Sequence, residues 1–221
     1  MKHTSADASG QWIARINEWS NLELDDGAAS ALERYAEWLE TEAVAAGAIG
    51  PDELDRLWPR HVGDSLLYAA VFRHRRGGAI DVGSGAGLPG IPVAIACPHL
   101  EVTLLDRSGR RSALLRRVVR ILRVANVRVL EADIDVIEGT FEVIVARASL
   151  PPDQAFPRVR RLLAPGGEAV VGLSRQSPPD AAALVAGAAR HGLQAEMVTI
   201  PADVLDSPAW LLRMTHRDQH S

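Results

Sequence analysis

The sequence predicts an α/β protein with a seven-stranded, mostly parallel sheet, helices on both faces and a helical segment in front of it. Three observations predict this class. Short apolar strand patterns alternate with helical patterns from residue 79 onward. A glycine-rich loop follows the first of these strands. Residues 1–75 show only helical periodicity, which divides the chain into an N-terminal helical cap (1–75) and a sheet domain (76–221).

The cap is predicted to contain several helices. Apolar residues recur at helical spacing, as in Ile13 with Ile16 and Leu32 with Tyr35. Pro51 suits the first turn of a further helix, and the helical pattern continues over 64–72. We expect these helices to lie over the carboxyl edge of the sheet.

The sheet domain begins after two glycines at 77 and 78. The expected strands are 79–82, 101–105, 127–131, 141–146, 168–173, 194–200 and 210–215, and the expected helices are 88–96, 109–123, 153–163 and 180–191. Strand–helix alternation predicts a parallel sheet whose ligand lies at the carboxyl ends of the strands. The last two strands have no helical pattern between them, which predicts an antiparallel pair at one edge.

The loop after the first strand is the main candidate binding site. Gly83, Gly85 and Gly87 tolerate positive φ and have no Cβ, so a ligand can lie against the backbone. A helix expected to open at Leu88 directs free N–H groups at that ligand. The spacing G-x-G-x-G differs from the dinucleotide pattern G-x-G-x-x-G. Asp81, just before the glycines, suits a ligand with an ammonium group, such as S-adenosylmethionine.

Two further strand ends carry acidic residues. Asp106 closes the second strand and is placed to accept both ribose hydroxyls of a nucleoside. Asp133 and Ile134 follow the third strand, where an acid and an apolar neighbour suit an adenine. A Pro-Gly-Gly turn over 163–168 precedes the fifth strand. Together these features resemble the class I, Rossmann-like S-adenosylmethionine-dependent methyltransferase pattern.

A narrower resemblance follows from three motifs. They are the Arg60-His61-x-x-Asp64-Ser65 run, the glycine loop extended by Leu-Pro-Gly-Ile-Pro, and the segment 103–108 with two arginines after it. The chain resembles the bacterial small-subunit ribosomal RNA guanine-N7 methyltransferase family over about residues 35–167. The resemblance implies S-adenosylmethionine as cofactor, a helical cap on a methyltransferase domain, and small-subunit ribosomal RNA as partner.

The resemblance also implies site residues. Cofactor contacts fall on Gly83, Leu88, Ile134, Asp135 and Arg147, in addition to the residues assigned above. Substrate contacts fall on Arg60, His61, Asp64, Ser65 and Arg175. Guanine N7 carries a lone pair and no proton, so we expect no general base, and Arg147 acts by positioning. His61 is expected to orient the carboxylate of Asp64 or to shape the substrate site.

The substrate-side motifs depart from the family. Residues 42–49 replace a W-N…N-L-T segment, Ser149 stands where the family has an aromatic residue, and Ser174-Arg175 replaces a lysine. Two alternatives therefore stay open. One is an S-adenosylmethionine-dependent methyltransferase of a small molecule or another RNA. The other is an inactive homologue that binds the cofactor and acts as a binding module.

The amino-acid composition narrows the class of protein. Hydrophobic residues make up 47% of the chain, and no apolar run approaches a membrane span. The single cysteine and the lack of an export signal predict a cytoplasmic protein, and no residue cluster suggests a metal. Net charge is −4, yet the segment 107–128 holds eight arginines and no acid, which is compatible with an RNA backbone. The oligomeric state is not indicated.

Overall fold

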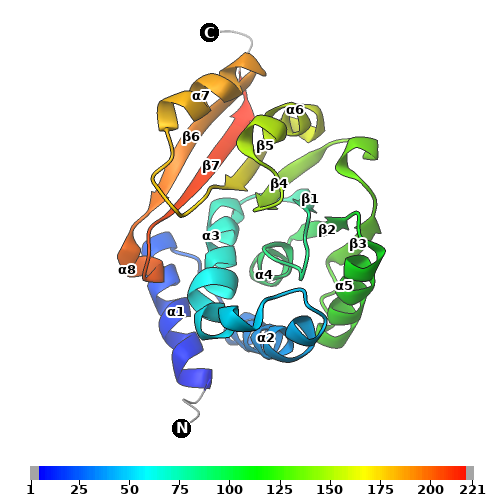
Figure 1. The fold of residues 1–221 in the computed structure, drawn as a ribbon, viewed down its shortest axis with the longest axis vertical. Coiled ribbons are helices and arrows are strands. Elements are labelled where there is room, and N and C mark those ends of the chain that lie inside the picture. The colour runs from blue at the N-terminus through cyan, green and yellow to red at the C-terminus, as the bar shows by residue number, and fades with distance from the viewer. Residues whose placement is uncertain (1–4, 218–221) are drawn as a thin grey trace.

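The computed structural model describes residues 5–217; the outermost residues of both predicted domains, 1–4 and 218–221, lie outside it. One sheet of seven strands runs through the molecule in the order β3-β2-β1-β4-β5-β7-β6 (Figure 1). The strands are β1 (Gly77–Val82), β2 (Leu100–Asp106), β3 (Val127–Glu131), β4 (Phe141–Arg147), β5 (Leu163–Gly172), β6 (Leu193–Ile200) and β7 (Ala209–His216). This confirms the predicted α/β class.

Strands β1 to β5 pair in parallel, whereas β7 is antiparallel to both β5 and β6. The predicted antiparallel edge pair is therefore confirmed. The sequence did not indicate that β7 lies between β5 and β6, nor that a four-residue helix, α8 (Ala202–Leu205), connects the pair. Strand β5 also begins five residues earlier than expected, within the Pro-Gly-Gly turn.

Alternation along the strands divides the core between the two faces of the sheet. Ala79 and Val143 belong to a cluster with the helices from α1 to α5, and Ile80 and Ile144 to a cluster with α6 and α7. The helices of the sheet domain are α4 (Gly90–Ala96), α5 (Gly109–Leu122), α6 (Pro152–Leu162) and α7 (Ala181–Arg190). Helix α4 starts two residues after the predicted Leu88, because residues 83–89 are used by the loop itself.

The N-terminal helices cover part of one face of the sheet, the face that carries Ala79 and Val143. They are α1 (Ser5–Ser20), α2 (Asp26–Trp38), a π-helical turn (Leu39–Ala43), a 3₁₀ turn (Pro51–Arg56), a second π-helical turn (Trp58–Val62) and α3 (Gly63–Phe72). Their buried side chains join the same cluster as α4 and the sheet. Figure 1 shows α2 and α3 next to α4, with α1 on the outer side of α3. The segment from Ala48 to His61 reaches the carboxyl ends of the strands, and so do Asp64 and Tyr68 of α3. Tyr35 of α2 donates to Ala86 O in the loop after β1. The predicted position over the carboxyl edge therefore holds for part of the N-terminal segment, while the apolar sides of α1–α3 cover a face of the sheet.

No helix in the described range 5–217 is long and apolar enough to cross a membrane.

Candidate functional site

Two cavities lie next to each other at the carboxyl ends of the central strands. The first, here called the loop cavity, has a volume of about 740 Å³ and is bordered by the glycine loop. The second, here called the side cavity, has a volume of about 900 Å³ and lies beside the ends of β4, β5 and the start of β7. Four residues line both: His61, Arg147, Ala148 and Leu150. These residues form the common wall of the two cavities.

The glycine loop is held to the sheet by its backbone. The N–H groups of Gly83 and Ser84 both donate to Leu105 O, at 2.8 and 3.0 Å. Gly85 has φ +59, and a Cβ built there would meet only a backbone oxygen, at 3.9 Å. A side chain at residue 85 would therefore enter the loop cavity, which is the position where a ligand approaches the backbone.

The other two glycines of the loop are required by packing. A Cβ at Gly83 would lie 2.5 Å from Ser149 Cβ, and Gly83 also lines the loop cavity. At Gly87, with φ +104, a Cβ would collide with Ile91. Gly87 does not line either cavity, so its predicted contact with the cofactor has no support in this structure.

Asp106 connects the loop to the next strand end. Its Oδ2 accepts from Gly85 N at 3.0 Å and its Oδ1 accepts from Ser108 N at 2.9 Å. The side chain is only 4% exposed, yet it lines the loop cavity. Since each carboxylate oxygen has two lone pairs, one acceptor site on each oxygen remains for a ligand hydroxyl.

Asp81 lies elsewhere than expected. Its side chain points toward α4, where Oδ2 accepts from Gly90 N at 2.9 Å, and its buried Oδ1 accepts no hydrogen bond from residues 5–217. Burial raises the pKa of Asp81 to about 7. Asp81 is fully buried and lines neither cavity, so the predicted contact with the ammonium group of the ligand is not supported. Strand alternation is the reason: Asp81 shares its face with Ala79, under the helices.

The turn after β3 forms the far wall of the loop cavity. Asp133, Ile134 and Asp135, which the sequence predicts as cofactor contacts, all line it. Asp133 Oδ1 accepts from Asp135 N at 2.9 Å and so fixes the turn. Arg158 binds the Asp135 carboxylate at 2.7 and 2.9 Å and lowers the pKa of that group. Leu88, on the opposite side, also lines the cavity.

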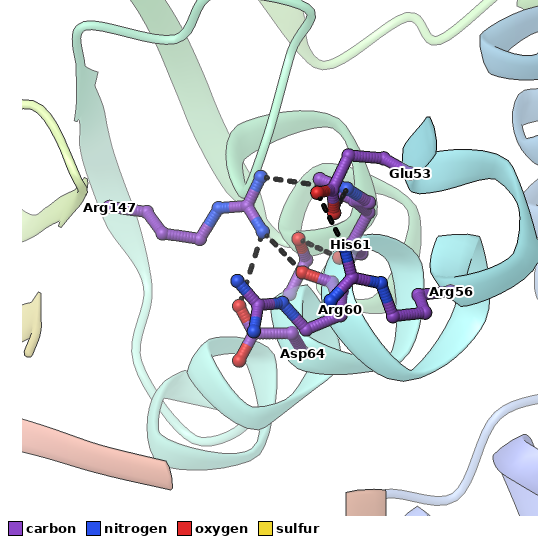
Figure 2. Close-up of polar contacts among 7 residues, drawn as sticks. Glu53, Arg56, Arg60, His61, Asp64 and Arg147 are labelled. Atoms are coloured by element: carbon purple, nitrogen blue, oxygen red, sulfur yellow. Dashed lines mark hydrogen bonds and ion pairs between the residues drawn. The ribbon is translucent and has the colours of Figure 1, made fainter. Parts of the chain in front are cut away.

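Arg147, the last residue of β4, is the centre of the common wall (Figure 2). Its Nη1 donates to Arg60 O at 2.9 Å and to Asp64 Oδ2 at 3.2 Å. Its Nη2 lies 3.4 Å from His61 Nδ1, and His61 Nε2 lies 3.2 Å from Glu53 Oε2. The guanidinium is thus held on three sides in a partly buried position, with its side chain 18% exposed.

The protonation state of His61 follows from these contacts. Burial and the positive charge of Arg147 lower the pKa of His61, although Glu53 opposes this shift. A neutral imidazole with its proton on Nε2 donates to Glu53 and accepts from Arg147 through Nδ1. Of the two roles expected for His61, orientation of Asp64 is not seen, because the Asp64 carboxylate is occupied by two arginines. The position of His61 on both cavities agrees with the other role, shaping the substrate site.

Of the remaining predicted substrate residues, Arg60, Asp64 and Arg175 line the side cavity. Arg175 Nη2 is ion-paired with Asp64 Oδ1, so Asp64 bridges Arg147 and Arg175. Ser65 is the exception. It is fully buried, donates to His61 O at 2.6 Å within the helix, and lines neither cavity.

Several lining residues gave no signal in the sequence. Tyr68 on α3, Leu173 after β5 and Trp210 on β7 all line the side cavity. Each lies in an apolar pattern that is typical of a core, and only the placement of α3 and β7 beside β5 exposes it to a cavity.

Ala148 has φ +55, a conformation that L residues rarely adopt, directly after Arg147 in the common wall. Among residues 5–217 no group of acidic, histidine or cysteine side chains could hold a metal ion.

The fold and the loop together define a class I, Rossmann-like methyltransferase domain. A glycopeptide N-methyltransferase, MtfA, solved in complex with S-adenosylmethionine, superposes with a TM-score of 0.58 at 14% identity, covering 71% of this chain and 94% of that one. A mutant of MtNAS, also solved with S-adenosylmethionine, gives 0.58 at 20% identity, covering 86% and 73%. These likenesses show the fold.

The family follows from the sequence comparisons. Residues 28–200 match the model of rRNA small subunit methyltransferase G, so the chain belongs to that family. Ribosomal RNA small subunit methyltransferase G of Arthrobacter sp. is 38% identical over 189 residues, 82% of this chain and 85% of that protein. The same-named protein of Acidothermus cellulolyticus is 44% identical over 134 residues, which is 61% of this chain and 60% of the relative's length.

Proposed function

We propose that this protein transfers the methyl group of S-adenosylmethionine to N7 of a guanine in small-subunit ribosomal RNA, with the loop cavity holding the cofactor and the side cavity the guanine. The observation that carries the proposal is the wall shared by the two cavities, formed by His61, Arg147, Ala148 and Leu150. Family membership supports the substrate, because its relatives bear the name of small-subunit ribosomal RNA methyltransferases. Such a substrate implies the cytoplasm as its location.

The residues of the loop cavity fit the cofactor. Open space above Gly85 admits a ligand against the backbone, and Asp106 has acceptor sites left for ribose hydroxyls. Ile134 supplies an apolar contact for an adenine ring, and Asp133 an acceptor for its amine. When bound, the cofactor supplies a methyl group activated on a sulfonium.

Guanine N7 is nucleophilic without loss of a proton, so the protein needs no general base for this transfer. The wall residues agree with that requirement. His61 is engaged on both ring nitrogens, by Glu53 and Arg147, and the Arg147 guanidinium is bound by Asp64 and Arg60 O. The protein contributes the orientation of cofactor and guanine and a site partly shielded from water. Holding two reactants in the right geometry removes a large part of the reaction barrier.

Labelled S-adenosylmethionine tests the proposal. The protein is incubated with stripped small-subunit RNA from cells that lack the native modification, with large-subunit RNA as control. We expect label in the small-subunit RNA only, and strand cleavage at one site after borohydride and aniline treatment, because N7-methylated guanine carries a fixed positive charge. Labelled RNA without that cleavage would contradict N7 as the acceptor.

One observation favours a second candidate, a methyltransferase of a small molecule. Part of the arginine-rich helix is used within the molecule: Arg117 pairs with Glu42 at 2.5 Å, and Arg110 donates to Ala46 O. These contacts leave fewer cations for a phosphate backbone. A metabolite extract incubated with labelled cofactor distinguishes the two, since label in that fraction and none in RNA supports the second candidate.

A further inference from the structure

The polar groups on the side cavity have unused hydrogen-bonding capacity. Asp64 is buried, with a side chain 9% exposed, and each of its two oxygens accepts from one arginine, Arg147 or Arg175. An ionised carboxylate has about four lone-pair sites, so one acceptor site on each oxygen is left. Arg175 Nη1 is buried and makes no hydrogen bond within the described chain.

The unused groups thus form a set of two adjacent acceptors and one donor. Asp64 and Arg175 both line a cavity whose other walls include Tyr68, Leu173 and Trp210. An unpaired buried donor is costly, because it has lost its water without gaining a partner. A planar ligand with two adjacent donors and a neighbouring acceptor would satisfy the whole set at once.

The Watson–Crick edge of guanine has this arrangement. N1–H and the 2-amino group are adjacent donors, and O6 is the acceptor beside N1. We propose that Asp64 accepts from N1–H and the 2-amino group while Arg175 donates to O6, so that these two residues select guanine. The proposal rests on the proposed function, since it places the methyl acceptor in the side cavity.

This orientation also accounts for the position of N7. N7 lies on the major-groove edge of guanine, and only O6 borders both that edge and the Watson–Crick edge. When the Watson–Crick edge is bound by Asp64 and Arg175, N7 is left free of both residues. Enzymes that modify a base take it out of the stack into such a pocket, read its Watson–Crick edge and pack its faces.

The same groups reject the other purines. Adenine presents an acceptor at N1 and a donor at its 6-amino group. Its N1 lone pair would therefore face the acceptor Asp64, and its amino group would face the donor Arg175. Inosine lacks the 2-amino group and leaves one acceptor of Asp64 unpaired. Xanthine carries an oxygen at position 2, which is repelled by the carboxylate.

Nucleotide selectivity tests the assignment. The dissociation constants of GMP, IMP, XMP and AMP are measured by NMR titration of the full chain saturated with S-adenosylhomocysteine. The native protein is expected to bind GMP about tenfold more tightly than IMP or XMP. We expect AMP to bind more weakly than all three. Equal binding of GMP and AMP, or binding of no nucleotide, overturns the proposal.

Asp64→Asn gives the sharper result. The amide oxygen still accepts from N1–H, but the amide N–H₂ now opposes the 2-amino group of guanine and donates to the oxygen of xanthine. XMP is therefore expected to bind about tenfold more tightly than GMP in this variant. A retained preference for GMP overturns the proposal. The ratio of two constants within one variant does not depend on how much of it is folded.

Two further variants complete the test. Asp180→Asn makes the same chemical change on the same cavity, at an exposed residue that caps α7, and is expected to leave the order of nucleotides unchanged. Arg175→Met is expected to weaken GMP, IMP and XMP together by about tenfold, because all three have O6. If the ratios follow this pattern but small-subunit RNA is not methylated, the proposed function fails and guanine selection stands. If the RNA is methylated and Asp64→Asn still prefers GMP, the selection alone fails.

Discussion

Arg147 donates to Asp64 Oδ2 at 3.2 Å across 83 residues of sequence, from the end of β4 to the start of α3. The contact joins the sheet to the N-terminal helices at the wall between the two cavities. Both side chains are mostly buried, at 18% and 9% exposed, so the ion pair is poorly screened by solvent. Removing Asp64 leaves Arg147 without a carboxylate partner, whereas removing Arg147 leaves Asp64 with Arg175 as its remaining cation.

The first prediction concerns this contact. Arg147→Ala is expected to lower methyl-transfer turnover by at least about tenfold, because His61, Asp64 and the Arg60 carbonyl lose their common partner. Rates with stripped small-subunit RNA measure the effect. Arg190→Ala, at the end of α7 and outside both cavities, is the matched control and is expected to keep native turnover. Native turnover in Arg147→Ala would show that the wall contacts do not position the reactants.

The titration of His61 provides a second prediction. Arg147 lowers the pKa of His61 and Glu53 raises it, so Arg147→Met should raise that pKa and Glu53→Gln should lower it further. Histidine-detected NMR during a pH titration measures both shifts. The sign for stability follows: since the folded pKa lies below the ordinary value of 6.5, the unfolded chain binds the proton first, and the free energy of unfolding falls as pH decreases below 6.5. Shifts of equal sign in the two variants would contradict the observed contacts.

A third prediction follows from the buried Asp81. Its pKa is raised from 3.8 to about 7, so between these values the unfolded chain has lost the proton that the folded chain retains. The free energy of unfolding therefore falls with rising pH in this window, by up to about 1.4 kcal/mol per pH unit from this group. In Asp81→Asn that contribution is absent, and urea denaturation from pH 4 to pH 8 should give a correspondingly different slope. The variant should retain S-adenosylhomocysteine binding, because Asp81 does not line the loop cavity; a large loss of affinity would restore Asp81 as a ligand contact.

Gly85 tests the cofactor site. Gly85→Val places a branched side chain in the loop cavity and should abolish the increase in melting temperature caused by S-adenosylhomocysteine. Gly139→Val is the control, since Gly139 also has positive φ, at +85, but a Cβ there meets nothing within 4 Å and the residue lies outside both cavities. Both variants are strained by the backbone, so only the difference in ligand response is informative. Calorimetry with unchanged affinity in Gly85→Val would contradict the site.

The arginine-rich helix α5 gives a prediction for RNA binding. Arg120 is exposed and has no ion pair within the described chain, whereas Arg117 is engaged by Glu42. If α5 contacts phosphates, Arg120→Ala should reduce the log–log salt slope of RNA affinity by about 0.7–0.9, and Arg117→Ala should reduce it less, because Arg117 must first leave its partner. Filter binding over a range of salt concentrations measures the slopes. Equal slopes for Arg120→Ala and the native protein would exclude Arg120 as a phosphate contact.

The sequence by itself determined the class of the fold and the position of the loop cavity. Strand alternation, helical spacing and the glycines from Gly83 to Gly87 are local signals, because each depends on the conformation of a few neighbouring residues. They predicted a seven-stranded, mostly parallel sheet, an antiparallel pair at one edge and acidic residues at two strand ends, and the structure has all of these. The cluster of arginines that the structure places on α5 could also be recognised in the sequence.

The tertiary structure alone decided which side chains meet. It buried Asp81 under α4 and directed the Ser65 hydroxyl to the carbonyl of His61. It brought Arg147 and Arg175 to the same carboxylate, that of Asp64. It also inserted β7 between β5 and β6, which created the wall of the side cavity on which Trp210 lies. Periodicity states which face of an element is apolar but not which element covers that face. Contacts between segments 83 or 111 residues apart depend on the order of the strands and on the packing of the N-terminal helices, and neither is written in any local pattern.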